Sequence, residues 1–274
     1  MDLFNNLWRC MSTAFDKLVA IMTRLRGEKG CPWDKEQTHE TLKPYLIEES
    51  YEVIEAIDSG DSRNLKEELG DLLLQVVFHA EIARANGRFS IEDVLKGLTD
   101  KLVTRHPHVF GESRAETAED VLKNWEKRKL IEKGSERESL MDGIPASLPA
   151  LMRAEKIQKR ASKAGFDWPD RNGIIEKFEE EWNEFKSAIK EGVPEAVEEE
   201  TGDLLFTLVN LARSLRLDSE QTLRKSTEKF IFRYKDMERL AKLSGVGLEN
   251  LSADELNRLW TEAKRNASSP RKSP

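Results

Sequence analysis

Two sets of acidic residues recur along the sequence with the same internal spacing, and clustered carboxylates are typical ligands of divalent cations. Each set reads Glu-Glu-x-x-Glu followed by Glu-x-x-Asp, where x is any residue. The first set comprises Glu48, Glu49, Glu52, Glu68 and Asp71, and the second comprises Glu180, Glu181, Glu184, Glu200 and Asp203. Every position in the second set follows its counterpart by 132 residues. The sequence therefore predicts a duplicated acidic site, with one copy in each half of the chain.

One glycine in each half stands midway between the acids and predicts how they meet. Glu52 lies eight residues before Gly60 and Glu68 lies eight residues after it, and the second half repeats this symmetry around Gly192. If the glycine forms the turn of an antiparallel helical hairpin, a rise of about 1.5 Å per residue places both glutamates about 12 Å from the turn. An outer pair of acids, eleven residues away on each side, is matched in the same way. We therefore expect four carboxylates to face one another in each hairpin.

The chemistry of such a site is that of a hard, oxygen-seeking cation. Mg²⁺ keeps several of its waters and is usually held by carboxylates together with the phosphates of a substrate. A bound cation turns the mutual repulsion of the acids into attraction and lowers the pKa of a coordinated water, which makes a nucleophile. We expect Mg²⁺, with Mn²⁺ as a substitute, and phosphoanhydride hydrolysis. The expected metal ligands are Glu49, Glu52, Glu68 and Asp71 in the first half and Glu181, Glu184, Glu200 and Asp203 in the second.

Cationic and aromatic residues recur downstream of each acidic set. Those of the first half, Lys101, Arg105, Trp125 and Lys129, correspond to Lys229, Arg233, Trp260 and Lys264 in the second. Arginine forks onto two phosphate oxygens and lysine acts as a point charge, while the two tryptophans are candidates to face a base or ribose. The alternative is that the basic residues are exposed neighbours, four residues apart on a helix surface. Trp33 and Trp168, which precede the two acidic helices, are predicted to anchor loops on the core.

Two other kinds of metal site fit the sequence less well. His106 and His108 flank a proline, but a site needs three or four ligands, and the sequence offers neither a further ligand nearby nor a counterpart in the second half. A di-iron carboxylate bundle needs Glu-x-x-His on two helices, whereas the residue three positions after Glu68 and after Glu200 is aspartate. Magnesium therefore remains the expected ion.

The composition limits both the fold class and the partners. Charged residues make up 35% of the 274 residues against 38% hydrophobic ones, which suits amphipathic helices with solvated outer faces. A net charge of −7 and a pI near 5.4 argue against nucleic acid as a partner, because its backbone is bound by a basic surface. Cys10 and Cys31 form no disulfide framework, and no apolar run reaches membrane-spanning length. We therefore expect a cytoplasmic protein that neither enters a membrane nor binds nucleic acid.

Helical periodicity dominates the chain, so the predicted fold is all-α, with a tandem repeat of two helical-hairpin domains. The expected divisions are an amino-terminal domain at 11–132, a linker at 133–149, a carboxy-terminal domain at 150–265 and a disordered tail at 266–274. Residues 1–10 are interpreted as an extension from an upstream start. Three apolar stripes are expected to be core, namely Phe15, Leu18, Val19, Met22 and Leu25; Leu69, Leu72, Leu73, Val76 and Val77; and Leu204, Leu205, Leu208, Val209 and Ala212.

Taken together, these motifs resemble the MazG family of nucleoside triphosphate pyrophosphohydrolases in its two-domain bacterial form. The resemblance extends from about Met11 to Arg265 and rests on both acidic sets, on Gly-Cys-Pro-Trp-Asp-Lys-Glu-Gln-Thr at 30–38 and on Arg-His-Pro-His-Val-Phe at 105–110. It implies magnesium-dependent hydrolysis of ribo- or deoxynucleoside triphosphates, ATP included, to the monophosphate and pyrophosphate. It also implies an all-α homodimer of helical bundles, in which helices of two subunits pack around the sites, and a housekeeping role in removing unwanted nucleotides.

The same resemblance implies roles for individual residues. The catalytic set falls in the carboxy half and comprises Glu180, Glu181, Glu184, Glu200 and Asp203, of which Glu180 assists the attacking water. The nucleotide contacts fall on Lys177, Lys229, Arg233, Trp260 and Lys264, with Lys101, Arg105, Trp125 and Lys129 in the amino half. Lys177 corresponds to Tyr45, so the amino half lacks one cation beside the polyphosphate. We therefore expect unequal sites, with the carboxy half as the main catalytic centre.

The expected mechanism is in-line attack by a metal-activated water at the α-phosphorus or its neighbour, with pyrophosphate leaving on a second cation. Two alternatives from other classes remain at this stage. A regulatory sensor would bind nucleotide with little or no turnover, although the acids retained in both halves argue against it. A purely structural helical scaffold would show no magnesium-dependent nucleotide binding.

Overall fold

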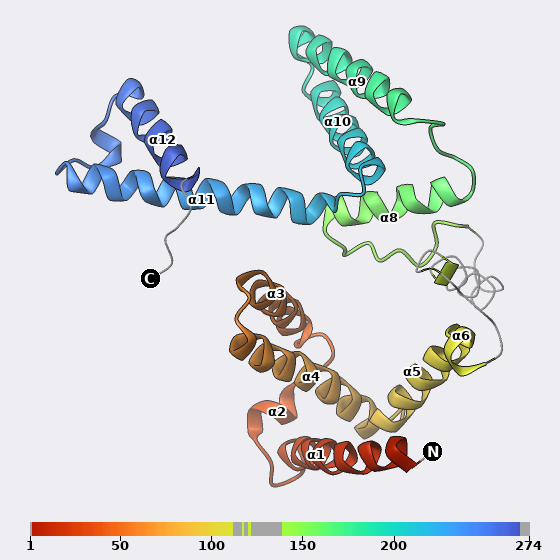
Figure 1. The fold of residues 1–274 in the computed structure, drawn as a ribbon. Helices are drawn as coiled ribbons and strands as arrows, with labels where there is room; N and C mark the ends of the chain where they lie inside the picture. The colour runs from red at the N-terminus through yellow and green to blue at the C-terminus, as the bar shows by residue number, and fades with distance from the viewer. Residues whose placement is uncertain (1, 112–116, 118–119, 122–138, 269–274) are drawn as a thin grey trace. The chain divides into compact units, whose positions relative to one another are not determined.

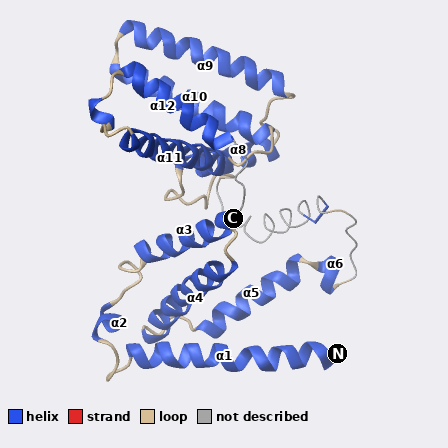
Figure 2. Ribbon diagram, turned by 60° about the vertical axis from the view of Figure 1, so that its left-hand side comes forward, coloured by secondary structure: helices blue, strands red, loops and turns tan. Residues whose placement is uncertain are grey.

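The structure is a computed structural model that describes residues 2–111, 117, 120–121 and 139–268. Every regular element in these residues is helical, as Figure 2 shows, which confirms the all-α prediction. None of the described helices combines the length and the apolar character that crossing a membrane requires. The chain divides into two compact units, residues 1–134 and 135–274, and the division falls inside the segment expected to be a linker.

The first unit is built around a hairpin of two long helices. Its elements are α1 (Asp2–Arg26), α2 (Pro32–Glu36), α3 (Lys43–Ser59), α4 (Ser62–Ala85), α5 (Ile91–Arg105) and α6 (Pro107–Phe110) (Figure 1). Helices α3 and α4 form the hairpin, and α1 and α5 both pack against α4. Helix α1 begins at Asp2, within the residues interpreted as an extension from an upstream start.

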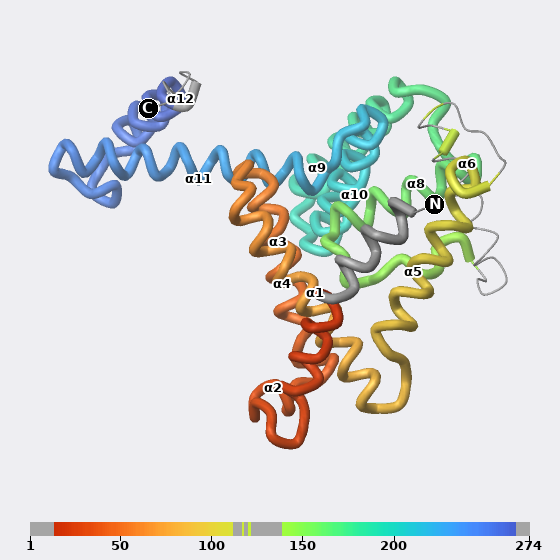
Figure 3. Tube along the Cα trace, turned by 60° about the horizontal axis from the view of Figure 1, so that its bottom comes forward, coloured from red at the N-terminus to blue at the C-terminus, as the bar shows by residue number. Residues whose placement is uncertain are grey.

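The second unit repeats the plan of a hairpin with flanking helices. Its elements are α8 (Ala150–Lys163), α9 (Arg171–Glu191), α10 (Pro194–Ser214), α11 (Ser219–Leu243), the 3-10 helix η2 (Leu248–Asn250) and α12 (Ala253–Ser268). Helices α9 and α10 form the hairpin, α8 packs against α10, and α12 folds back on α11. Figures 1 and 3 both show α12 beside the end of α11 that is remote from α10. Because α12 continues to Ser268, the first three residues of the expected tail are helical, and the others lie outside the described residues.

Both hairpins turn at the glycines that the symmetry of the sequence singled out. Gly60 ends α3 with a φ of 72°, and Gly192 ends α9 with a φ of 74°. Glycine adopts this left-handed conformation readily because it has no Cβ. In the first unit Asp61 then caps α4 by accepting hydrogen bonds from the backbone N–H groups of Arg63 and Asn64. The turns thus determine which residues of the paired helices lie opposite one another.

The core of the first unit is formed by α1, by α4 and by Leu42, the residue directly before α3. Its buried members are Met22, Leu42, Val77, Phe78 and Ile82. Three residues of the expected α1 stripe pack against them, namely Phe15, Leu18 and Val19. Each such side chain contributes about 1.5–3 kcal/mol when it is fully buried, so this cluster holds α1 on the hairpin.

The apolar stripe on the second helix of each hairpin is only partly buried, so the prediction that it is all core was wrong. In α4, Leu69, Leu73 and Val76 are 50%, 40% and 41% exposed, and in α10, Leu205 and Leu208 are 51% and 49% exposed. In each unit, the other helices cover one face of the hairpin and leave these side chains exposed. Periodicity identifies side chains that favour burial, but it does not identify what covers them.

Candidate metal centres

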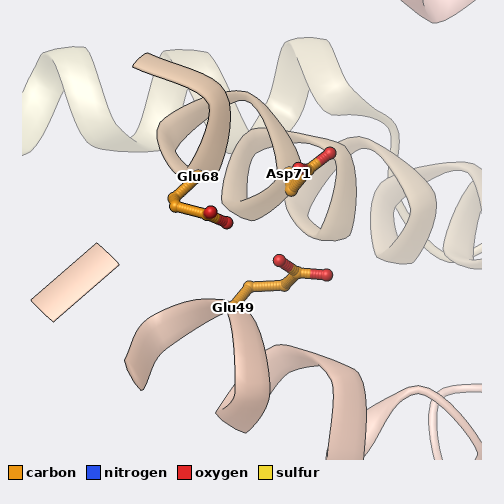
Figure 4. Close-up of side chains that lie close together, drawn as sticks. All are labelled: Glu49, Glu68 and Asp71. Carbon is orange, nitrogen blue, oxygen red and sulfur yellow. The ribbon is translucent and has the colours of Figure 1, made fainter. Parts of the chain in front are cut away.

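The first candidate centre lies in the α3–α4 hairpin. Glu49 of α3 and Glu68 and Asp71 of α4 point toward one another across the hairpin, as Figure 4 shows. One carboxylate oxygen of each lies within 4.8 Å of the others, and all three residues are partly buried. The equal spacing about Gly60 produces this arrangement, because it brings residues of the two helices to the same level.

The second candidate centre occupies the corresponding place in the α9–α10 hairpin. Glu181 and Glu184 of α9 and Glu200 of α10 each contribute a carboxylate oxygen, and the three oxygens lie within 4.8 Å of one another. Glu181 is buried, and Glu200 Oε2 is buried without a hydrogen-bond partner in the described part of the chain. A buried carboxylate oxygen is costly unless a cation or donor satisfies it. This all-oxygen set therefore fits a hard ion such as Mg²⁺.

The fourth expected ligand of each centre stands beside the other three. In the first centre, Glu52 is not among the three acids whose oxygens gather, yet its carboxylate helps to raise the pKa values of Glu49 and Glu68. Asp203 lies outside the close group in the second centre and acts electrostatically on Glu200. Each centre therefore consists of three acids in close approach and a fourth at their edge.

The crowded carboxylates disturb one another's ionisation. Burial raises the pKa of Glu49, and three neighbouring carboxylates of the same centre raise it further. The pKa values of Glu68 and Glu200 are also raised, first by burial and then by adjacent acids. Raised pKa values show that these negative charges are held together at a cost in free energy. A divalent cation would reverse the sign of that interaction.

Among the described residues, a lysine contacts the second centre, and none contacts the first. Lys177 Nζ lies 2.7 Å from Glu180 Oε1 and 2.8 Å from Glu181 Oε1, one helical turn before them in α9. The corresponding residue of α3 is Tyr45, whose ring meets that of Trp33 edge-on at 6.0 Å between centroids. The two centres therefore differ, with an ammonium group beside one set of acids and a neutral phenol in its place in the other.

The expected nucleotide contacts of the carboxy half gather on α11 and α12. The ring of Trp260 in α12 lies 5.2 Å from the ring of Phe230 in α11. Arg233 and Lys264 lie over the same indole at 5.8 Å and 5.7 Å, which are cation–π distances. Lys229 is exposed one turn before Arg233. We call Phe230, Arg233, Trp260 and Lys264 the Trp260 cluster, and it presents aromatic surface and two cations together.

The Trp260 cluster and the acids of the second centre do not come together within one chain. The cluster lies on α12 and on the middle of α11, against which α12 packs, whereas the acids lie on α9 and α10. In the first unit, Lys101 is exposed on α5 and Arg105 is buried. Trp125 and Lys129 lie outside the described residues.

The sequence profile of the MazG nucleotide pyrophosphohydrolase domain matches residues 37–110 and again residues 171–237, together more than half of the chain. The chain belongs to the MazG family. It is 52% identical over 250 residues to the Thermotoga maritima protein named nucleoside triphosphate pyrophosphohydrolase/pyrophosphatase MazG, with 91% of this chain and 95% of that protein covered. It is 46% identical over 254 residues to the nucleoside triphosphate pyrophosphohydrolase of Escherichia coli K12, with 91% and 97% covered.

Each MazG match contains one complete hairpin and the helix that follows it. Residues 37–110 span α3 to α6, and residues 171–237 span α9, α10 and most of α11. The acids of both centres therefore lie inside the MazG repeat. Trp260 and Lys264 lie in α12, beyond the second match. The Trp260 cluster thus joins residues of the MazG repeat to a helix outside it.

Two contacts of this MazG chain were not expected from the sequence. Phe230 was not recognised as a neighbour of Trp260, although its position three residues before Arg233 places both on one face of α11. Asp167, in the loop between α8 and α9, pairs with Arg213 of α10 at 2.6 Å. No signal in the sequence points to that pair, because its members stand on different elements.

Trp33 and Trp168, which were expected to anchor loops on the core, are 50% and 38% exposed, and Trp33 belongs to the short helix α2. Trp33 meets the buried ring of Phe78 edge-on, with 6.4 Å between centroids. Trp168 lies against Gly173 in the first turn of α9, where a Cβ would approach the indole to 2.7 Å. Trp33 therefore contacts the core through Phe78, whereas Trp168 contacts the first turn of the acidic helix that follows it.

Proposed function

We propose that this MazG protein hydrolyses nucleoside triphosphates, ribo or deoxy and including ATP, to the monophosphate and pyrophosphate, with Mg²⁺ as its ion or Mn²⁺ in its place. The observation that carries the proposal is the gathering of Glu181, Glu184 and Glu200 from the two helices of a hairpin. Relatives named nucleoside triphosphate pyrophosphohydrolases match 91% of the chain, which supports the same reaction on phosphoanhydride bonds. This activity suits the removal of unwanted nucleotides in the cytoplasm.

The residues of the second centre divide into three roles. The cation ligands are Glu181, Glu184, Glu200 and Asp203. When bound, the cation offsets the charge of the polyphosphate and lowers the pKa of a coordinated water. Glu180 is 57% exposed beside these acids, where it can accept a proton from the attacking water. Lys177, within reach of the same acids, holds a phosphate oxygen as a point charge.

A second copy of the chain completes each site in this proposal. Within one chain the Trp260 cluster lies on α11 and α12, whereas the acids lie on the helices of the α9–α10 hairpin. The hairpin also leaves apolar side chains bare, among them Leu205 at 51% and Leu208 at 49% exposure. Monomeric soluble proteins rarely expose contiguous apolar faces. These features support a homodimer in which α11 and α12 of one subunit reach the acids of the other.

Changing Leu205 and Leu208 to aspartate tests the homodimer. An unpaired charge is costly to bury, so the double variant should not dimerise and should lose turnover. Light scattering over a range of concentrations should give the mass of two chains for the unmodified protein and of one chain for the variant. A monomeric unmodified protein with full turnover would overturn the shared site.

Phosphorus NMR of the products, with a panel of nucleoside triphosphates and with or without Mg²⁺, tests the reaction itself. Monophosphate plus pyrophosphate should form only with the metal and should be lost in Glu184→Gln. Glu195→Gln is the matched control, because Glu195 is an exposed acid of α10 outside both centres. Diphosphate plus phosphate would place the reaction at another bond. No turnover, with metal-dependent binding retained, would instead support a sensor.

A further inference from the structure

An ion pair at the second centre indicates how that centre is controlled. Lys177 contacts Glu181, one of the three acids whose oxygens gather within 4.8 Å. We infer that Lys177 is an internal counter-cation, which keeps free divalent cations out of the carboxy-half centre until the phosphates of a nucleotide draw the lysine away. The inference rests on the proposed function, because it concerns the same acids and the same class of substrate.

The contacts of Lys177 show why the lysine and a metal ion exclude each other. Its Nζ lies 2.8 Å from Glu181 Oε1 and 2.7 Å from Glu180 Oε1, as in charge-assisted hydrogen bonds. The Glu181 side chain is only 8% exposed, so solvent screens its interactions weakly. As an ammonium group, Lys177 places a positive charge directly on this carboxylate. A divalent ion on Glu181 would have to share that carboxylate with a positive group that repels it.

Lys177 is also placed to move. Its side chain is 33% exposed, and its second partner, Glu180, is 57% exposed. The lysine precedes both glutamates along α9, which is the weaker order for an ion pair within a helix. A polyphosphate offers the ammonium group several charged oxygens at once. Nucleotide binding therefore frees Glu181 and supplies the phosphate ligands that Mg²⁺ favours, so that cation and nucleotide bind together.

The first centre has a different residue at this position. Tyr45 takes the place of Lys177, and its ring meets that of Trp33 at 6.0 Å. Across the described residues, no lysine or arginine pairs with Glu49, Glu68 or Asp71, although one oxygen of each lies within 4.8 Å of the others. Uncompensated acids attract a cation without help from nucleotide. Free divalent cations should therefore load the amino-half centre first.

Titration of the full-length protein with Mn²⁺ in the absence of nucleotide tests the inference, with free ion measured by electron paramagnetic resonance. We expect a tighter site that is lost in Glu49→Gln and a weaker site that is lost in Glu184→Gln. Lys177→Met removes the charge but keeps the chain length, and it should tighten the weaker site about tenfold. Lys186→Met is the matched control, because Lys186 lies over the Trp182 ring of the same helix at 5.9 Å and not on an acid.

Two further measurements complete the test, with circular dichroism to verify that each variant is folded. Tyr45→Lys should weaken the tighter site by a similar factor. A non-hydrolysable triphosphate analogue should tighten the weaker site more in the unmodified protein than in Lys177→Met. Two equal sites, no Mn²⁺ binding, or an unchanged titration in Lys177→Met would each overturn the inference.

The NMR assay of products separates this inference from the proposed function. Turnover to pyrophosphate together with an unchanged Lys177→Met titration rejects the counter-cation role alone. A weaker site that tightens in Lys177→Met, in a protein without turnover, supports the counter-cation role and rejects the pyrophosphohydrolase proposal alone.

Discussion

Arg213 donates a hydrogen bond to Asp167 Oδ1 at 2.6 Å, and this ion pair closes the open end of the α9–α10 hairpin. Asp167 belongs to the loop that leads into α9, whereas Arg213 stands in the last turn of α10. The same guanidinium also donates to Asn210 Oδ1. The pair therefore positions the start of α9 on α10, at the end opposite the Gly192 turn.

Asp167→Asn should lower the free energy of unfolding by about 1–2 kcal/mol at neutral pH, because a charge-assisted hydrogen bond is lost. The hydrogen bond from Arg213 holds the pKa of Asp167 below its usual range. The contribution of the pair is therefore complete above the pKa of the unfolded chain, about 3.9, and is lost as the pH falls through the lower folded value. The free energies of unfolding of the variant and the unmodified protein, measured in urea, should differ less at pH 3 than at pH 7. Equal differences at both pH values would contradict this account.

Gly192→Ala should destabilise the second unit by about 1 kcal/mol, because alanine adopts the left-handed conformation of the turn with strain. No heavy atom lies within 4 Å of the added Cβ, so a steric clash contributes nothing. Gly202→Ala is the control, since Gly202 lies inside α10 with the same open surroundings. Alanine favours helix there, so this variant should be more stable by about 0.5–1 kcal/mol. Denaturant unfolding should show that the free energy of unfolding falls in Gly192→Ala and rises in Gly202→Ala. A change of the same sign in both variants would show that the turn conformation is not the cause.

Glu184→Gln and Glu52→Gln should differ in their effects on turnover, although the two glutamates are counterparts in the repeat. Glu184 belongs to the centre beside Lys177, and Glu52 stands at the edge of the centre beside Tyr45. We expect Glu184→Gln to lower kcat by about 100-fold or more, since even outer-shell partners of a metal contribute up to that factor. Glu52→Gln should retain most of the activity. Rates of pyrophosphate release measure both, and the reverse ranking would move the main catalytic centre to the amino half.

Trp260→Ala should raise KM about tenfold with a smaller change in kcat, because stacking and cation–π contacts of an indole contribute about 1–3 kcal/mol to binding. The residue stands at the centre of the Trp260 cluster, between Phe230, Arg233 and Lys264. Leu243→Ala is a control on the same pair of helices, because Leu243 is 73% exposed at the end of α11. Initial rates over a range of ATP concentrations separate KM from kcat. An unchanged KM in Trp260→Ala would remove the cluster from the nucleotide site.

The sequence by itself determined the helices, the two hairpins and the facing of the acids. Helical periodicity and glycine turns are local properties, and Gly60 and Gly192 take the positive φ that their positions predict. Once the turn is known, the spacing of Glu49 and Glu68 along regular helices brings their carboxylates together. The difference between Lys177 and Tyr45 was likewise visible, because both stand four residues before a predicted ligand.

Only the tertiary structure decided which side chains are covered and which distant residues meet. Leu205 belongs to the apolar stripe yet stays exposed, because its coverage depends on helices remote in the sequence. Arg213 pairs with Asp167, and Trp260 contacts Phe230, although the members of each pair belong to different elements. The number of residues between them does not predict how far apart they lie in space. Helix packing depends on how whole surfaces fit together, so these contacts follow from the assembled fold and not from any local pattern.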